Sequence, residues 1–388
     1  MIVRPLTEYC TLNMGQSPDS KTYNTQGKGL PFYQGNVDFG ESHPITRVWC
    51  SAPVKVAEDG DILISVRAPI GAMNMAVERC CIGRGLAALT PIRNKCSKKF
   101  LYYALQSKVD SLIAQGTGST FKAIGKKVLE TTCIPAYSTI EQEQIAETIG
   151  HIDNTIAARR NQLALLDQLV KSRFIELFGD PVSNSMGLPT EPMTTICAII
   201  DGDRGKNYPK QDEFSDTGYC LFLNAKNVTA TGFSFENRMF ITKEKDDALH
   251  NGKLERGDVV LTTRGTLGNL AFYDDSVPFE NVRINSGMVI LRMKKSVMTE
   301  VFFMEQFKLQ LQSIKGKIAS GSAQPQLPIS TMNKIRILLA PMALQEQFAA
   351  FVEQTDKSKY YSSLSFRYCQ AAANTYRQEW MTCRTSDF

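Results

Sequence analysis

Two stretches of the chain resemble known ligand-binding loops, and in both the residue spacing is wrong for that chemistry. Segment 118–127, GSTFKAIGKK, has six residues between its two glycines, whereas a phosphate-binding loop has four and places Ser or Thr after its lysine. Segment 201–212 begins Asp-Gly-Asp like a calcium loop, but it has glycine at the fifth position and Lys206 where glycine is required. We therefore expect neither a nucleotide site nor a calcium site in these segments.

Other signatures of catalysis or metal binding are also missing from the sequence. It contains no G-x-G-x-x-G dinucleotide motif, no G-x-S-x-G nucleophile elbow and no Asn- or Asp-Pro-Pro-aromatic run of the kind that amino-methyltransferases use. Its three histidines, His43, His151 and His250, are far apart in sequence and have few cysteines near them, so no zinc site is expected. The sequence thus predicts neither a bound metal nor a bound cofactor, and it favours a non-catalytic protein.

Polar loop residues suit a nucleic-acid partner better, because Lys and Arg bind phosphates while Arg, Lys, Asn and Gln read base edges in the major groove. The loop at 15–36 is dense in glycine, hydroxyl, amide and basic groups, as binding loops often are. Candidate DNA contacts in the N-terminal half are Lys21, Tyr23, Asn24, Lys28, Gln34, Asn36, Arg67 and Arg84. Candidates in the C-terminal half are Arg204, Lys206, Asn207, Lys210, Asn224, Lys226, Asn227, Arg264, Arg283 and Asn285. For each of them, a solvated or structural role is the alternative.

Arg67 and Arg264 end two similar motifs, GDILISVR at 60–67 and GDVVLTTR at 257–264. Their shared position after a predicted strand allows either a fold-stabilising hydrogen bond or a phosphate contact. Residues common to both motifs are poor candidates for sequence discrimination, since two domains that read different sequences should differ at their reading residues.

A long helix is predicted over 138–179 and must position these loops. Ser138 and Glu141 form a capping box at its start, and Gly179 with Pro181 marks its end. At about 1.5 Å per residue the helix would be about 60 Å long. Its apolar side chains recur at steps of three and four, as in a coiled coil, and they would need a partner helix. This helix seam consists of Ile145, Ile149, Ile152, Ile156, Leu163, Leu166, Val170 and Leu177.

The order of motifs before and within this helix is repeated after it, which indicates an internal duplication. Besides the two GD motifs, CIGRG at 81–85 is echoed by RINSG at 283–287, and Gly118-Ser119 by Gly321-Ser322. IEQEQI at 140–145 then returns as LQEQF at 344–348. The second copy should therefore also end in a long helix, with a weaker and shifted seam that includes Phe348, Phe351, Leu364 and Tyr368.

The duplication predicts a mixed α/β (α+β) fold with internal pseudo-two-fold symmetry. Two globular recognition domains would be separated by a pair of long antiparallel helices that form a coiled coil. The expected segments are a first domain at 1–137, the central helix at 138–179, a second domain at 180–342, and the C-terminal helix with a short tail at 343–388.

The charge and the cysteine content of the chain are compatible with an intracellular protein that binds DNA. Net charge is +5, and the first 137 residues hold 16 basic against 10 acidic side chains, which permits a polyanionic partner. Ten cysteines occur without a C-x-x-C pair, which is typical of reduced thiols in a cytoplasmic protein. No apolar run is long enough to span a membrane, so no membrane partner is expected.

These motifs resemble those of the specificity subunit of type I restriction-modification systems. The resemblance covers essentially the whole chain. Its most specific matches are GQSPDSKTYN and GLPFYQG within 15–35, GDILISVRAP at 60–69, CIGRGLAAL at 81–89 and PAYSTIEQEQI at 135–145. GDVVLTTRGTLGN at 257–269 and INSGMVILR at 284–292 resemble a different recognition-domain type of the same family.

The resemblance implies a function in a larger prokaryotic complex. Each recognition domain would read one half of a bipartite, asymmetric site in double-stranded DNA, and the helices would set the spacer and dock two modification (methyltransferase) subunits. Restriction (motor and nuclease) subunits would join that core. S-adenosylmethionine, ATP and Mg would belong to those partners, and this chain would bind no cofactor. Two alternatives remain: a protein–protein scaffold that never touches DNA, and an unrecognised DNA-modifying enzyme.

Overall fold

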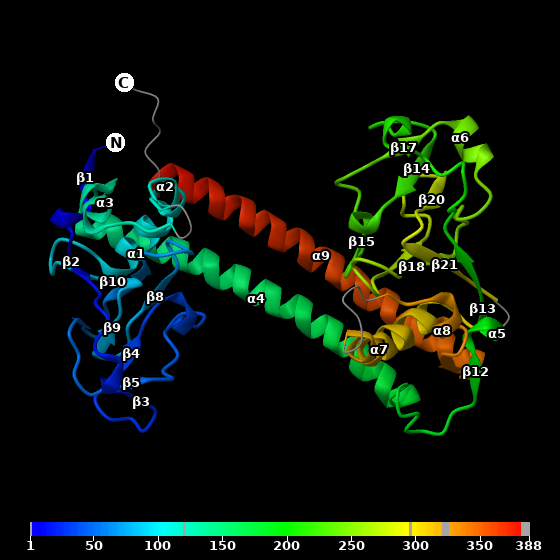
Figure 1. Ribbon diagram of the computed structural model, residues 1–388, viewed down its shortest axis with the longest axis horizontal. Helices are drawn as coiled ribbons and strands as arrows, with labels where there is room; N and C mark the ends of the chain where they lie inside the picture. Colours follow the sequence, from blue (N-terminus) through cyan, green and yellow to red (C-terminus); the bar gives the residue numbers. More distant parts are fainter. Residues whose placement is uncertain (1, 119–121, 295–296, 320–325, 382–388) are drawn as a thin grey trace. The chain divides into compact units, whose positions relative to one another are not determined.

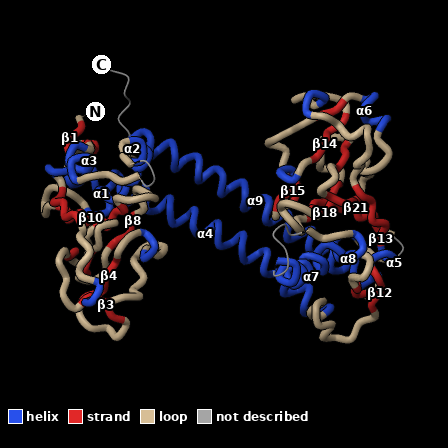
Figure 2. The backbone as a smooth tube through the Cα atoms, viewed as in Figure 1, coloured by secondary structure: helices blue, strands red, loops and turns tan. Residues whose placement is uncertain are grey.

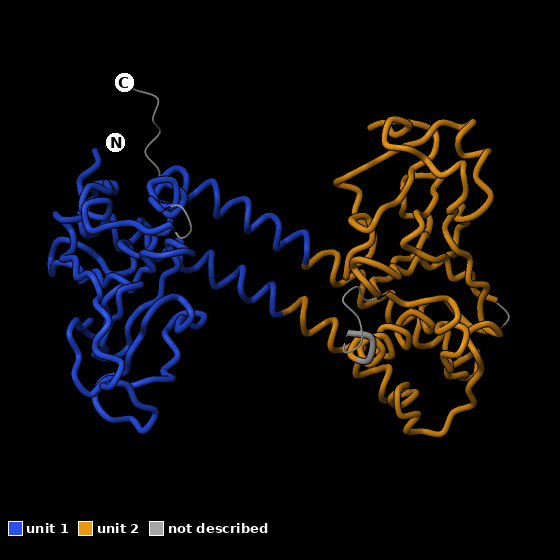
Figure 3. Tube along the Cα trace, viewed as in Figure 1, with its two compact units in different colours: residues 1–161, 363–388 blue, residues 162–362 orange. Residues whose placement is uncertain are grey.

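The computed structural model describes residues 2–118, 122–294, 297–319 and 326–381. Ser119 of the first repeated Gly-Ser pair, the second pair at 321–322 and the tail at 382–388 lie outside the described residues. Two helices of 40 residues each are labelled in Figure 1, α4 (Thr139–Phe178) and α9 (Met342–Met381). The chain divides into two compact units, drawn in two colours in Figure 3. Unit 1 comprises 1–161 and 363–388, and unit 2 comprises 162–362, so each contains a globular part and a portion of both helices.

Among its described residues, the globular part of unit 1 contains a four-stranded sheet, a five-stranded sheet, a strand pair and three short α-helices. Figure 2 colours the helices blue and the strands red. The first sheet is antiparallel in the order β2-β10-β7-β8, formed by Cys10–Met14, Leu86–Pro91, Ile62–Ser65 and Met73–Met75. The second has the order β3-β5-β4-β9-β6, formed by Tyr23–Asn24, Trp49–Cys50, Leu30–Tyr33, Cys80–Ile82 and Val56–Ala57. A strand pair, β1–β11, joins Val3–Pro5 to Cys133–Pro135. The short helices are α1 (Lys98–Gln106), α2 (Val109–Ala114) and α3 (Lys126–Thr131).

Unit 2 repeats this arrangement, which confirms the predicted duplication. Its antiparallel sheet has the corresponding order β13-β21-β18-β19, formed by Cys197–Asp201, Met288–Met293, Asp258–Thr262 and Leu270–Tyr273. The second sheet is β17-β14-β20, formed by Phe240–Ile241, Cys220–Leu223 and Val282–Ile284, and β14 and β20 are parallel as β4 and β9 are. The remaining strands are β12 (Thr190–Pro192), β22 (Arg336–Leu338), β15 (Val228–Thr229) and β16 (Gly232–Phe233). The helices are α5 (Met193–Ile196), α6 (Lys243–Ala248), α7 (Glu300–Ala319) and α8 (Ile329–Met332).

The repeated GD motifs form the central strands of the two sheets, and their apolar side chains allow both faces of each strand to be buried. Successive side chains of a strand point to opposite faces. In β7, Ile62 and Ile64 pack into the core that α1 and α4 share, and Leu63 packs into the core of the second sheet. Asp61 precedes this strand, and its buried carboxylate accepts a hydrogen bond from the Glu58 amide at 2.9 Å. The corresponding Asp258 accepts from the Glu255 amide at 2.7 Å, so the motif encodes the same strand entry twice.

Helix α4 starts and stops as its sequence predicts. The Ser138 hydroxyl and amide both donate to the Glu141 carboxylate, at 2.7 and 2.8 Å, and the Glu141 amide donates back to the hydroxyl at 3.3 Å. Gly179 ends the helix with a φ of 74°, a left-handed conformation that favours glycine. Each of the eight predicted seam residues is buried or half-buried, whereas most of the other positions in the middle of the helix are exposed.

Within each unit, α4 and α9 run antiparallel. In unit 1, Asp153 pairs with Arg377, and the Arg160 guanidinium lies 5.9 Å from the centre of the Phe366 ring. The numbers rise along α4 while those of its partners fall along α9, which defines the direction. Unit 2 shows the same trend, because Asp167 pairs with Lys359 at 2.9 Å and Arg173 lies 5.9 Å from the Phe351 ring.

The predicted seam of α9 is only partly right. Tyr368 is 77% exposed and is no seam residue, while Phe348 is buried and Phe351 and Leu364 are half-buried. The observed seam keeps one register, with small or polar side chains in its middle, so no shift occurs. Thr355, for example, is buried, and its hydroxyl donates to the Phe351 carbonyl of the same helix. The buried residues of the observed α9 seam are Phe348, Val352, Thr355, Ser362 and Ala373.

One buried glutamine ties each long helix to its globular part. The Gln142 side chain accepts from the Ser97 amide at 2.9 Å and donates to the carbonyls of Lys95 and Tyr137 at 3.1 and 2.9 Å. Gln345 makes the equivalent three bonds in unit 2, to the Thr299 amide and to the carbonyls of Val297 and Ala340. Both side chains are fully buried. We call this arrangement the glutamine clamp.

None of the helices in the described part of the chain is long and apolar enough to cross a membrane.

Replacing Gln142 by alanine should lower the free energy of unfolding by about 2 kcal/mol, because it leaves buried backbone groups without partners. Chemical denaturation of the two proteins measures the difference. Gln144→Ala is the matched control, since Gln144 is exposed on the same helix, and its effect should stay within about 0.5 kcal/mol. Equal stability of the two variants would show that the clamp contributes nothing.

Candidate nucleic-acid interface

Four of the predicted DNA contacts come together in a polar hollow of about 230 Å³ in unit 1. Gln34 and Asn36 follow the end of β4, Arg67 follows the end of β7, and Arg84 lies in the turn between β9 and β10. Gly35, Ser65, Ala68 and Gly85 complete the lining. The hollow thus lies where three strands end, and the side chains that reach it are mainly hydrogen-bond donors.

Close backbone packing holds these three strand ends together. The Gly85 amide donates to the Gln34 carbonyl at 3.2 Å, and the Val66 amide donates to the Gly85 carbonyl at 2.9 Å. A Cβ atom at Gly85 would lie 2.4 Å from the Gln34 carbonyl oxygen, so only glycine fits between them. The Arg84 amide is fixed by the Ser17 hydroxyl at 3.2 Å, while the Arg84 side chain is exposed.

Arg67 and Arg264 have a shared backbone role and exposed side chains. Each makes an isolated β-bridge, Arg67 with Ala123 and Arg264 with Gln326. Because the backbone alone forms these bridges, the fold does not require a guanidinium at either position. Both side chains are exposed, which leaves them free to contact a phosphate.

Equivalent contacts in unit 2 gather Arg204 and Arg264 at the same strand ends. The Arg264 amide donates to the Gly287 carbonyl at 3.2 Å, and the Arg204 guanidinium donates to the Ser286 carbonyl at 3.3 Å. Arg204 is also held by the Asp201 carboxylate at 3.0 Å. Lys226 is exposed on the turn after β14. The Thr266 hydroxyl donates a hydrogen bond to the Ala225 carbonyl of this turn at 3.4 Å.

Several predicted contacts instead stabilise their own loops. The Asn24 amide donates to the Lys28 carbonyl at 2.8 Å and accepts from the Lys28 amide at 2.9 Å. Asn227 is fully buried and donates to the carbonyls of Ser234 and Asn237. A buried side chain with both polar atoms in use has no group left for a base, so the DNA-contact prediction for Asn227 is wrong.

Three further candidates use their polar groups internally but stay partly exposed. The Tyr23 hydroxyl donates to the Pro18 carbonyl at 2.9 Å, and its ring stacks on Phe32. Asn207 donates to the Ala248 carbonyl, and Asn285 accepts from the Gly287 amide. The Asn224 side chain caps the turn that follows it, while Lys21, Lys28, Lys206 and Lys210 have exposed side chains on loops. These residues stay predictions.

The DNA-contact prediction for Arg283 is wrong, because its side chain is 5% exposed and belongs to a buried network. Its guanidinium pairs with the Asp246 carboxylate and donates to the carbonyls of Asn251 and Leu249 at 2.7 and 3.1 Å. Burial alone would raise the pKa of the Asp246 carboxyl, but hydrogen bonds from Lys253 and Arg283 hold it below its usual range. Arg283 therefore stabilises the second sheet and is not available to DNA.

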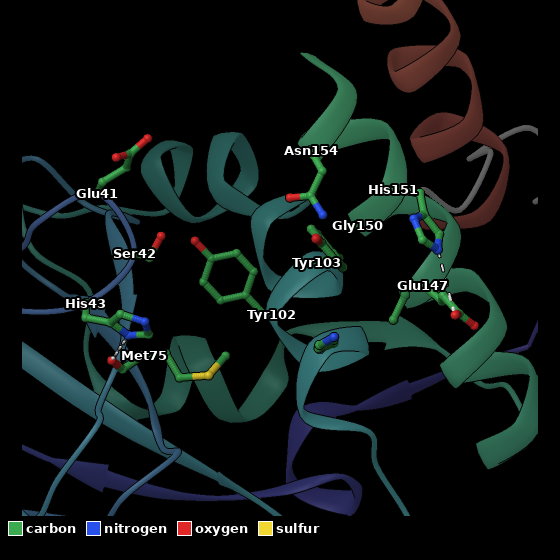
Figure 4. A pocket seen from close by; sticks show the side chains of 12 residues that line it. Glu41, Ser42, His43, Met75, Tyr102, Tyr103, Glu147, Gly150, His151 and Asn154 are labelled. Carbon is green, nitrogen blue, oxygen red and sulfur yellow. Dashed lines mark hydrogen bonds and ion pairs between the residues drawn. The ribbon is translucent and has the colours of Figure 1, made fainter. Parts of the chain in front are cut away.

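A larger hollow of about 420 Å³ in unit 1 was not predicted (Figure 4). Tyr102 and Tyr103 of α1 line it together with Gly150 and Asn154 of α4 and the loop around His43. Burial raises the pKa of both tyrosines, and the nearby Asp153 adds to this effect. Its lining residues come from four separate segments, at 41–43, Met75, 99–103 and 146–154, so no local motif marks it. No group of three potential metal ligands occurs within the residues that the structure describes.

A family model for the type I restriction modification DNA specificity domain matches the chain twice, over residues 1–168 and 194–360. The putative type I restriction enzyme MjaX specificity subunit of Methanocaldococcus jannaschii is 40% identical over 164 residues, which are 42% of this chain and 39% of that protein. The MjaIX specificity subunit of the same organism is 22% identical over 376 residues, 87% of this chain and 83% of that protein. The crystal structure of a type I S subunit from M. genitalium shares the fold, with a TM-score of 0.61 and 17% identity over 99% of this chain and 96% of that one.

Arg283→Ala should lower the free energy of unfolding by about 3 kcal/mol, because it removes one of the two cations that pair with the buried Asp246 carboxylate and leaves the Asn251 and Leu249 carbonyls without their donor. Urea unfolding measures the change. Arg264→Ala, at an exposed arginine of the same unit, should change stability by less than about 0.5 kcal/mol. If Arg283→Ala instead kept full stability and lost DNA binding, Arg283 would be a DNA contact after all.

Proposed function

The chain belongs to the type I restriction-modification DNA specificity family, and from this premise we propose that each unit reads one half of a bipartite DNA site. The observation that carries the proposal is the pair of equivalent strand ends, one in each unit. Arg67 and Arg264 occupy equivalent, exposed positions just after these strand ends, and the side chains around them differ. Two copies of one fold with different polar surroundings suit a ligand that presents two different sequences.

Binding rests on two kinds of contact. Exposed guanidinium and ammonium groups hold backbone phosphates, and Gln34 and Arg84 in the unit 1 hollow reach base edges in the major groove. Since phosphate contacts release counterions, affinity should fall steeply as salt increases.

The long helices set the spacer between the half-sites and dock the partners. Helix α4 is continuous over 40 residues, about 60 Å at 1.5 Å per residue. In unit 2, Leu165 and Leu169 of α4 and Tyr361 of α9 are exposed, as apolar residues at a protein interface are. We assign this surface to modification (methyltransferase) subunits, two of which would bind the chain.

Catalysis is assigned to the partners. Modification subunits would bring S-adenosylmethionine, and restriction subunits would bring ATP and Mg, while this chain would bind no cofactor and catalyse no step. The setting would be the cytoplasm of a prokaryote, where the DNA substrate is found.

Sequence-specific binding by the assembled complex tests the proposal against its two alternatives. The chain is co-purified with its modification subunits, and a library of duplexes is selected for binding. Enrichment of one bipartite sequence is expected. Assembly without any sequence preference would favour a protein–protein scaffold, and methyl transfer by the purified chain alone would favour an unrecognised DNA-modifying enzyme.

Lengthening the helix pair should lengthen the spacer and leave both half-sites unchanged. Four residues inserted after Ala158 add about 6 Å, or about two base pairs, and close to one full helical turn. A paired insertion after Arg367 in α9 preserves the antiparallel contacts, because Arg160 lies over Phe366. Methylome sequencing of host DNA measures the spacer.

Four residues inserted after Met186, in the exposed loop between α4 and β12, serve as the control for the helix insertions. This control should retain the original spacer. An unchanged spacer in the paired helix variant would contradict the assignment of the helices as the spacer.

A further inference from the structure

The two units present different side chains at equivalent points of the same scaffold. We infer that Val37 and Arg84 of unit 1, and Lys226 of unit 2, discriminate between base sequences. Arg67 and Arg264, in contrast, bind backbone phosphates of any sequence. The inference rests on the proposed function and assigns individual residues within it.

Val37 and Lys226 hold the middle position of matching three-residue turns. One turn (Asn36–Asp38) follows β4, and the other (Ala225–Asn227) follows β14. The last side chain of each turn bonds to the residue just before the turn: Asp38 accepts from the Gly35 amide at 3.4 Å, and Asn227 accepts from the Asn224 amide at 2.9 Å. The first turn starts one residue farther from its strand than the second does, but each middle residue holds the same position relative to its closing bond.

Val37 is not part of the buried core of unit 1. Its side chain is 69% exposed, next to Asn36, which lines the polar hollow. The Arg47 guanidinium donates to the Val37 carbonyl at 2.8 Å and so fixes the backbone at this position. A rigidly held valine on a polar surface suits an apolar contact with a ligand. At the equivalent point of unit 2, Lys226 offers an exposed ammonium group instead.

Arg84 and Ser286 form a second non-matching pair. Each lies one residue before a glycine whose carbonyl accepts a hydrogen bond from the end of the central strand. That donor is the Val66 amide for Gly85 and the Thr263 amide for Gly287, at 2.9 and 2.8 Å. Unit 1 therefore places a guanidinium where unit 2 has a short hydroxyl side chain.

Arg67 and Arg264 are, by contrast, the same residue at the same point in both units. Each follows the central strand and makes the same kind of β-bridge. A residue that is identical in both copies cannot distinguish two half-sites, but it suits the phosphate backbone, which is the same in both.

The chemistry of each discriminating residue identifies its base. Arginine pairs bidentately with O6 and N7 of guanine, lysine also prefers these acceptors, and apolar side chains contact the C5-methyl group of thymine. The half-site of unit 1 should therefore contain a guanine facing Arg84 and a thymine facing Val37. The half-site of unit 2 should contain a guanine facing Lys226.

Methylome sequencing of hosts that carry single variants of the full complex tests these assignments. Val37→Ala and Arg84→Ala should each relax one position of one half-site, and Lys226→Ala one position of the other. Arg67→Ala and Arg264→Ala should keep the full motif, weaken binding on every sequence, and reduce the salt dependence of binding by about one phosphate contact. Val54→Ala and Arg79→Ala are matched controls, exposed residues of unit 1 that do not line the hollow, and should leave the motif unchanged.

Base analogues then identify the atoms. Replacing the inferred thymine by deoxyuridine removes one methyl group and should weaken binding by the wild-type complex about fourfold. The Val37→Ala complex should show little of this loss, as expected for a direct contact. Replacing the inferred guanine by 7-deazaguanine should weaken binding by about tenfold or more, and the Arg84→Ala complex should be nearly insensitive to the change.

The two proposals fail in different ways. A complex that selects a defined bipartite motif, which the Val37, Arg84 and Lys226 variants all retain, would overturn these residue assignments and leave the proposed function intact. A wild-type complex that selects no motif would overturn the proposed function itself.

Discussion

The glutamine clamp is the contact on which the arrangement of each unit depends. One buried amide joins two backbone segments: the residues just before one helix and the residues just before a long helix. Because the side chain is fully buried, each of its hydrogen bonds replaces one to water, and losing a partner is costly. Each long helix therefore begins as part of its sheet domain. This explains why the compact units contain helix ends as well as sheets.

A second constraint places the polar residues. The central strands β7 and β18 are buried on both faces, so neither strand has an exposed polar side chain. Exposed polar groups are confined to the points where strands end and turns begin. Gln34, Arg67 and Arg84 reach one hollow for this reason, although they are far apart in sequence. The same reasoning places Arg204 and Arg264 near each other in unit 2.

Features encoded by local patterns could be predicted from the sequence. The duplication, the capping box of α4 and its apolar seam depend on neighbouring residues or regular spacing. Arg283 could not be assigned in this way, since its partner Asp246 lies 37 residues away. The second half of α9 was misread because the expected seam shifted to the large side chains of Leu364 and Tyr368, whereas the real seam continues through Ser362 and Ala373. Val37 was not among the sequence candidates because they were chosen for polarity, whereas aligning the two turns with each other brings it forward.

The construction of the three-residue turns bears on how such a protein changes over generations. Their closing bonds come from Asp38 and Asn227 and from the backbone, so the middle residue contributes little to folding. Exposed positions of this kind tolerate substitution with small effects on stability. If the turns read bases as proposed, a lineage could acquire a new recognition sequence by single mutations in one copy, while the other copy keeps its half of the site. The fold thus separates evolvability from stability at the middle residues of these two turns.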